Sequence, residues 1–228
     1  MNFDYLIHIA NYSDGVIYAL AALLLVELAV IIDRFWYLRR TLIGGTRVVL
    51  AVARTGALTQ PELEMLRRSA GKLPEAVLLE TALRHADKTK GEALANRLEE
   101  AILLMAPQFD RRLWILDTII TLAPLLGLFG TILGMFHAFG VLATPGSAPT
   151  AVTGGVADAL VATASGIFIA MLGLLTYNGL NSQIRMIMHQ LDSLKTMILN
   201  RLDGAPMVPL GKPLPAARAA HQPALQSA

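Results

Sequence analysis

Three long apolar stretches, at residues 15–32, 118–142 and 156–177, dominate this sequence of 228 residues. A helix needs roughly 20 residues to cross a hydrocarbon core about 30 Å thick, so each stretch is long enough to span a membrane. Hydrophobic residues make up 54% of the chain and charged residues 16%, which is too apolar for one soluble domain of this size. The sequence therefore predicts an all-α integral membrane protein with three transmembrane helices.

The basic residues are confined to two parts of the chain. Every Lys and Arg lies either between Arg34 and Arg112 or from Arg185 onward. Because basic loops stay on the cytoplasmic side, we expect the N-terminus to lie outside and the C-terminus in the cytoplasm. No basic residue precedes Arg34, so the first stretch lacks the n-region of a secretory signal and is expected to stay in the mature protein.

The polar segments have helical patterns of their own. Residues 61–70 and 74–86 each begin with a proline, which a first helical turn tolerates. An amphipathic helix is expected from Glu92, with Pro107 kinking or ending it. After residue 177, apolar residues recur every three or four positions, so the last helix should continue to about Asp203 and Gly204.

These patterns divide the chain into eight expected segments. The long cytoplasmic extensions should be helical, and the proline-rich end should be disordered. In order, the segments are a periplasmic N-terminal segment (1–14), transmembrane helix 1 (15–33), a cytoplasmic helical loop (34–112), transmembrane helix 2 (113–142), a periplasmic turn (143–154), transmembrane helix 3 (155–178), a cytoplasmic helix (179–204) and a disordered tail (205–228).

Small residues recur at helical spacing along the second and third stretches. They let membrane helices approach closely. Two compatible interpretations stay open, which are plain helix packing and a small-residue face that lines a central space around another helix. The candidates for this face are Pro124, Gly127, Gly130, Gly134, Ala159, Ala162, Gly166 and Ala170.

Two carboxylates within the spans are candidates for a proton pathway, because a charge near the bilayer centre costs at least ~2.5–3.5 kcal/mol. Asp158 could accept and pass protons near the outer end of the third span. Alternatively, it is a first-turn aspartate favoured by the helix dipole. Glu27 lies deep in the first span. It is either a protonated group of the pathway or a carboxylate that snorkels or pairs with Arg34.

Four other polar residues are candidates for the same pathway. Thr131 and Thr163 fall near the middle of their spans, where a hydroxyl can bond a carboxylate in either protonation state. The alternative is a bond back to a carbonyl of the same helix. His137 either titrates in the physiological range or is simply solvated at the interface. Asp117 is expected to open the second span, as a first-turn carboxylate or as a proton exit.

Enzyme chemistry has no support in this sequence. The chain contains no cysteine, which removes disulfides, thiolate metal sites and cysteine nucleophiles. No hydrolase elbow, zinc-ligand spacing, P-loop or dinucleotide fingerprint occurs. We therefore expect no enzyme activity, no metal or organic cofactor and no nucleic-acid partner.

Two motifs resemble those of the MotA/TolQ/ExbB proton-channel family. The first runs from Ala123 to Met135 and reads APLLGLFGTILGM, with Phe139 after it. The second is GVADALVATASG from Gly155 to Gly166, in a helix that ends in Tyr177 and Asn178. Flagellar MotA subunits normally have four spans, so the chain is nearer to ExbB and TolQ.

The resemblance implies a ring-forming homopentamer in the bacterial inner membrane. Its second and third helices would surround single-span partners of the ExbD or TolR type, whose aspartate carries protons as the coupling ion. Thr131 and Thr163 match the family's pore threonines, and Asp158 matches a glutamate, one methylene longer. The chain also lacks a proline that the family commonly has near Ala170.

The function implied by the resemblance is proton flow that drives motion of the partner helices, passed on to a periplasm-spanning protein such as TonB for outer-membrane import. A TolQ-like role with TolA in envelope constriction is the alternative within the family. The sequence from His137 to Phe139 resembles some TolQ chains. A passive membrane scaffold is the alternative from another class.

Overall fold

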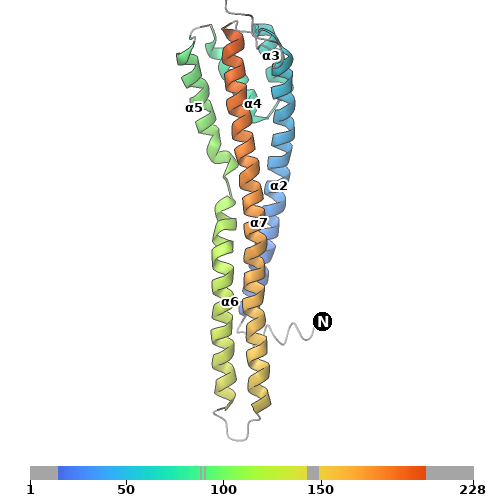
Figure 1. The fold of residues 1–228 in the computed structure, drawn as a ribbon, viewed down its shortest axis with the longest axis vertical. Coiled ribbons are helices and arrows are strands. Elements are labelled where there is room, and N and C mark those ends of the chain that lie inside the picture. Colours follow the sequence, from blue (N-terminus) through green and yellow to red (C-terminus); the bar gives the residue numbers. More distant parts are fainter. Residues whose placement is uncertain (1–14, 88, 90, 143–148, 204–228) are drawn as a thin grey trace, which may run out of the picture.

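The computed structural model describes residues 15–87, 89, 91–142 and 149–203, without the side chains of 141, 142, 149–153 and 158. Every regular element in this part of the chain is a helix, and together the helices form one elongated bundle (Figure 1). The helices are α2 (Val16–Arg54), α3 (Gln60–Ala70), α4 (Pro74–His85), α5 (Glu92–Phe109), α6 (Leu113–Leu142) and α7 (Pro149–Leu202). The expected segment 1–14 and tail 205–228 lie outside the described residues, as does half of the expected periplasmic turn, at 143–148. The other half was wrongly assigned, because residues 149–154 already belong to α7.

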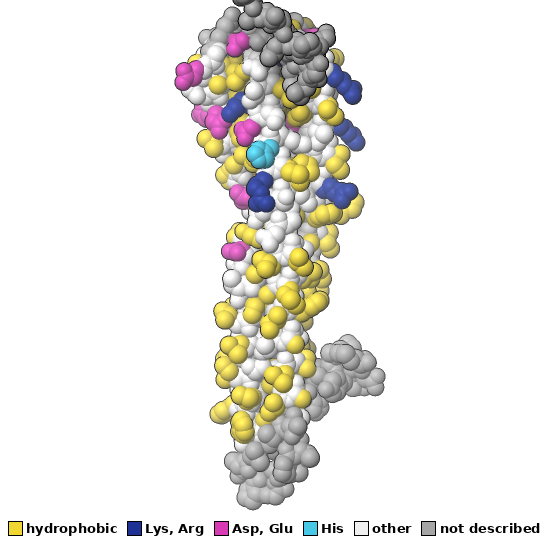
Figure 2. Space-filling model, in the orientation of Figure 1, with side chains coloured by type: hydrophobic (Ala, Val, Ile, Leu, Met, Phe, Trp, Pro, Cys, Tyr) yellow, Lys and Arg dark blue, Asp and Glu magenta, His cyan; other side chains and the backbone are white. Residues whose placement is uncertain are grey.

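Three of these helices, α2, α6 and α7, are long and apolar enough to cross a membrane, as the sequence predicted. Their apolar parts lie together at one end of the molecule. On the face shown in Figure 2, the Lys, Arg, Asp and Glu side chains gather over the other end. Because a charged side chain is costly in hydrocarbon, this separation marks the end that a bilayer surrounds.

The first helix continues well past its apolar stretch and ends only at Arg54. Its buried residues follow at steps of three and four through Leu38, Thr41, Gly45 and Val48. Such a stripe gives the extension an apolar face that packs on α3, α4 and α7. The glycine pair at 44 and 45 weakens helix propensity by about 1 kcal/mol each, so tertiary packing holds this part helical.

The third spanning helix, α7, is one uninterrupted helix of 54 residues. It ends at Leu202, next to the stop that Asp203 and Gly204 predicted. It packs against α2, α4, α5 and α6, and therefore links the apolar end to the polar end (Figure 1).

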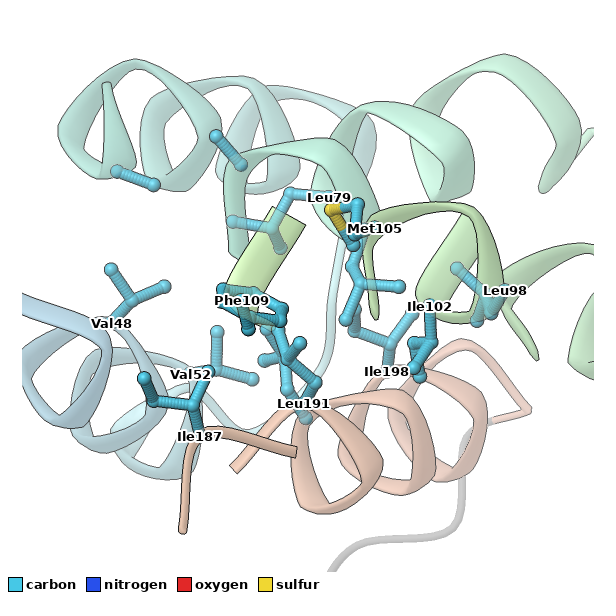
Figure 3. Packing of buried hydrophobic residues seen from close by; sticks show 14 of the residues in the cluster. Val48, Val52, Leu79, Leu98, Ile102, Met105, Phe109, Ile187, Leu191 and Ile198 are labelled. Atoms are coloured by element: carbon cyan, nitrogen blue, oxygen red, sulfur yellow. The ribbon is translucent and has the colours of Figure 1, made fainter. Parts of the chain in front are cut away.

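A hydrophobic core fills the polar end of the molecule. We call this end the distal bundle, which consists of α3, α4, α5 and the C-terminal halves of α2 and α7. Phe109 is 1% exposed at the end of α5. Figure 3 shows it among Val52 of α2, Leu79 of α4 and Leu191 of α7, so four helices share one apolar centre. Helix α5 runs through Pro107 and ends two residues later at Phe109. The proline therefore lies in the last turn of the helix.

Candidate functional site

Helices α6 and α7 approach each other through their small residues. A Cβ on Gly166 of α7 would lie only 2.4 Å from the carbonyl oxygen of Ala123, and one on Gly134 of α6 would lie 2.6 Å from the Cβ of Ala159. A Cβ on Gly127 or Gly130 would come within 2.8 Å of Ala162. Real Cβ atoms do not approach other atoms so closely, so only glycine fits at these positions.

This packing occurs within one copy of the chain, as expected if these glycines serve helix packing. At Gly127 and Gly166 the backbones of the two helices lie too close together for anything to pass between them. The two other members of the predicted small-residue face, Pro124 and Ala170, are half-buried. Any wider space would need more than one copy of the pair.

The two mid-span threonines make different hydrogen bonds. The Thr163 hydroxyl of α7 donates to the carbonyl oxygen of Gly127 on α6 at 2.9 Å, which joins the two spanning helices. The Thr131 hydroxyl donates to the carbonyl oxygen of Leu128 in its own helix at 2.7 Å. Each hydroxyl has one proton, which is thereby used, and keeps lone pairs that can accept a hydrogen bond.

Glu27 is 0% exposed and lies where all three spanning helices meet. A Cβ on Gly173 of α7 would lie 3.0 Å from its Oε1 and 2.8 Å from the side chain of Ile120 on α6, so the missing side chain makes room for the carboxyl group. Neither carboxyl oxygen has a hydrogen-bond partner among the described residues. A carboxyl group in such a site is far more stable neutral than charged.

The alternative that Glu27 snorkels or pairs with Arg34 is wrong. Arg34 instead lies 3.4 Å from Asp33. Seven residues separate positions 27 and 34, which is about 10 Å along a helix axis. Glu27 points into the seam with α6 and α7, and its side chain cannot reach the end of the span.

Helix starts differ from the expectation at two acidic residues. Helix α6 begins at Leu113, four residues before Asp117, and α7 begins at Pro149, nine residues before Asp158. Neither helix has an acidic residue in its first turn, so the first-turn interpretations of both aspartates are wrong. Asp117 is exposed, and the side chain of Asp158 lies outside the described residues.

His137 lies on the exposed side of α6, with Nδ1 3.0 Å from the carbonyl oxygen of Leu133. It also meets the ring of Phe136 edge to face, with 5.9 Å between the ring centroids. Both of these contacts are made within α6.

Sequence reasoning missed the partners of Glu27. Gly173 is seven residues after Gly166 and continues the small-residue stripe of the third span, a signal that was readable in the sequence. Ile120 carries no such signal, because one isoleucine in an apolar span resembles any other. Its place beside Gly173 depends on how α6 and α7 pack.

The outer sides of the spanning helices are covered with large apolar side chains. On α6, Phe136 is 75% exposed, and on α7, Leu175 is 74% exposed. A surface of this kind in water would be an aggregation site, whereas in a bilayer it faces lipid or another membrane helix. The fold and its apolar end thus define a three-span membrane protein.

Comparison with known families agrees with this class. Residues 70–193, which include α6 and most of α7, match the model of the "MotA/TolQ/ExbB proton channel family". The match covers more than half of the chain, and the chain belongs to this family. The family is one of channels rather than of enzymes.

Individual relatives carry both names that the sequence motifs indicated. "Putative biopolymer transport protein ExbB-like 3" of Synechocystis is 32% identical over 68% of this chain and 74% of that protein. "Biopolymer transport protein ExbB" of Neisseria gonorrhoeae is 34% identical over 49% and 53%. "Tol-Pal system protein TolQ" of Pseudomonas aeruginosa is 32% identical over 55% and 49%. The chain thus spans about half the length of several of the curated relatives it matches.

Proposed function

We propose that this chain is the proton-channel subunit of an energy-transducing complex in a bacterial inner membrane. Copies of the chain form a homopentameric ring around single-span helices of an ExbD-like or TolR-like partner. The N-terminus faces the periplasm, and the distal bundle is a helical extension in the cytoplasm. Proton flow, worth ~2.3 kcal/mol per charge per 100 mV, moves the partner helices and energises TonB-dependent import across the outer membrane.

The hydrogen bond between Thr163 and Gly127 is the observation that carries this proposal. It uses the hydroxyl proton of Thr163 and leaves the oxygen as an acceptor in the middle of an apolar span. Thr131 offers a second such oxygen on the neighbouring helix. Two acceptors at mid-span suit a protonated carboxylic acid on a partner helix, which would donate to them while it carries a proton.

The contact between α6 and α7 supports a ring. Because Gly166 meets the Ala123 carbonyl and Gly134 meets Ala159, no other helix fits between α6 and α7 of one copy. The partner must then pass between copies. Thr131, half-buried on α6, would lie at the edge of such a shared space.

The remaining pathway residues have separate roles in the proposal. Asp158 accepts protons near the periplasmic entrance, and Asp117 and His137 lie toward the two ends of α6. Glu27, buried among three spans, holds a proton as a neutral acid. It lies inside the subunit, so its proton exchanges with the pathway only when the three helices shift.

The experiment is proton flux into vesicles that contain the chain with its single-span partner. Thr163→Val removes the hydroxyl at nearly constant volume and should lower flux about tenfold or more, since a buried donor left without its acceptor costs about 1–3 kcal/mol. Thr176→Val is the matched control, because the Thr176 hydroxyl bonds only to carbonyls of α7 itself, Leu172 and Gly173 at 2.9 Å. Equal flux in both variants would remove the role of Thr163.

A TolQ-like role is the alternative within the family, and the similarity to a TolQ protein over 55% of the chain favours keeping it. Co-purification from the native cell decides between the two, since a TonB-like or a TolA-like protein would be found with the complex. If the partner-containing vesicles showed no flux at all, the chain would be a passive scaffold and the channel proposal would be wrong.

A further inference from the structure

A second buried carboxyl group lies in the distal bundle, far along the chain from the spanning segment. Glu75 is the second residue of α4 and is 0% exposed. Neither of its oxygens has a hydrogen-bond partner among the described residues. Gly45 of α2 faces it so closely that a Cβ there would lie 2.0 Å from Glu75 Oε1. The glycine thus makes the space that the carboxyl group occupies.

Gln190 of α7 completes the junction. Its Oε1 would lie 3.0 Å from the same Cβ position on Gly45, and this oxygen is also buried without a partner. The amide is held in this orientation by its other end, since Nε2 donates to Thr46 Oγ1 at 2.7 Å and reaches the Leu42 carbonyl at 3.5 Å. Three acceptor oxygens, two from Glu75 and one from Gln190, therefore lie beside Gly45, and none has a hydrogen-bond partner among the described residues.

Acceptors left unpaired in a buried site cost about 1–3 kcal/mol each, and a buried charge without a counter-ion costs far more. A single proton on Glu75 removes the charge and can pair two of the three oxygens, which leaves one acceptor unpaired. A protonated carboxyl group has one O–H donor, and Gln190 Oε1 is a free acceptor on the same side of Gly45. Burial raises the pKa of Glu75, and the backbone N–H of the same residue opposes this only in part.

No charged side chain of the described helices is placed to neutralise Glu75. Four groups are engaged elsewhere: Arg67 pairs with Glu80, Lys195 with Glu99, Glu62 accepts from Thr59, and Arg201 donates to the Ala53 carbonyl. His85 lies half-buried at the far end of α4. The others on the surrounding helices are exposed, namely Arg39, Arg40, Arg47, Arg54, Glu64, Arg68, Arg84, Glu92, Arg97, Glu100, Arg185, His189 and Asp192.

We propose that Glu75 is a proton-binding site that joins α4 to α2 and α7, with the protonated carboxyl group donating to Gln190, and that loss of this proton loosens the junction. An acid favoured in its protonated form by folding stabilises the bundle at low pH. That stabilisation disappears as the pH rises through the pKa of the folded state. If the distal bundle is cytoplasmic, as the proposed function has it, the junction responds to cytoplasmic pH.

Hydrogen exchange on the full-length protein in detergent micelles tests this directly. After correction for the intrinsic pH dependence of exchange, the α4 amides of the wild type should exchange about tenfold faster or more at high pH than at low pH, the effect of leaving a buried acceptor unpaired at about 1–3 kcal/mol. Glu75→Gln is neutral at every pH and carries its own donor for Gln190, so its α4 amides should show no such increase. Glu80→Gln is the same substitution at a more exposed glutamate of α4, and its α4 amides should respond to pH as those of the wild type do.

Three results would overturn the proposal. The first is an equal pH response in the wild type and Glu75→Gln. The second is a change in the hydrogen-exchange protection of α4 when choline replaces sodium or potassium at fixed pH, which would indicate a bound cation. The third is an infrared spectrum of the wild type at neutral pH without a protonated-carboxyl band that is lost in Glu75→Gln. If that variant does not fold, the loss of this band as the pH rises is followed in Glu27→Gln, which removes the other buried carboxyl group. None of these measurements depends on proton flux.

Discussion

Arg112 Nη1 lies 2.7 Å from Asp33 Oδ2, and this ion pair ties the turn between α5 and α6 to the point where α2 leaves its apolar stretch. Arg112 is also the one non-glycine residue with a positive φ in the described part of the chain, at 69°. The turn therefore combines an unfavourable backbone conformation with an attractive contact between distant segments.

Two substitutions of Arg112 separate these effects, because both remove the ion pair and only alanine keeps a Cβ atom. A left-handed backbone costs roughly 1–2 kcal/mol at a residue with a Cβ, whereas a half-exposed ion pair contributes about 0.2–1 kcal/mol. Arg112→Gly should therefore be more stable than Arg112→Ala by about 1 kcal/mol. Chemical unfolding in detergent measures the difference. Equal stabilities would mean that the φ of this residue is not strained in solution.

Gly166 of α7 should tolerate no side chain. The added methyl group of Gly166→Ala would meet the Ala123 carbonyl and push α6 away from α7, at a cost of about 1–3 kcal/mol. Gly179→Ala lies on the same helix with nothing within 4 Å, so it should be neutral or stabilise by up to about 1 kcal/mol. Thermal unfolding of the two variants in the same detergent checks this. A stable Gly166→Ala would show that the two helices are not in close contact.

Glu27 should behave as a neutral acid. Glu27→Gln preserves its shape and adds no charge, so the variant should assemble and unfold as the wild type does. Glu27→Lys places a cation where no counter-ion lies among the described residues, and should prevent assembly, as measured by native mass. A Glu27→Gln variant that fails to assemble would indicate a charged carboxylate with a partner from another chain.

Glu62 should give a pH dependence of the opposite sign to that of Glu75. Its carboxylate accepts from the backbone N–H and the hydroxyl of Thr59, both at 2.8 Å, and these bonds lower its pKa. A carboxyl group with a lowered pKa stabilises the fold above the ordinary pKa of glutamate, and the effect is lost as the pH falls. Amides at the start of α3 should lose protection from exchange in acid, and Glu62→Gln should lose this response. Retained protection in the wild type would contradict the capping role.

The sequence predicted the class of the fold because that class depends on local composition. Stretches of about 20 apolar residues define helices that cross a membrane whatever their neighbours are. The proline starts of α3 and α4 and the end of α7 beside Asp203 are also local signals, and the structure has them within one or two residues. Family membership followed from two motifs within these same helices.

Only the tertiary structure decided which faces meet. A stripe of small residues indicates close approach but does not say to which helix, and α6 and α7 turn these stripes toward each other within one copy. Likewise Glu75 resembles any other glutamate in the sequence, and Glu27 stands out only by its place in an apolar span. Both are buried because a glycine of a distant helix, Gly45 or Gly173, leaves room for the carboxyl group. Helical periodicity is a property of a single segment, whereas burial of a charged group depends on contacts between segments far apart in the chain.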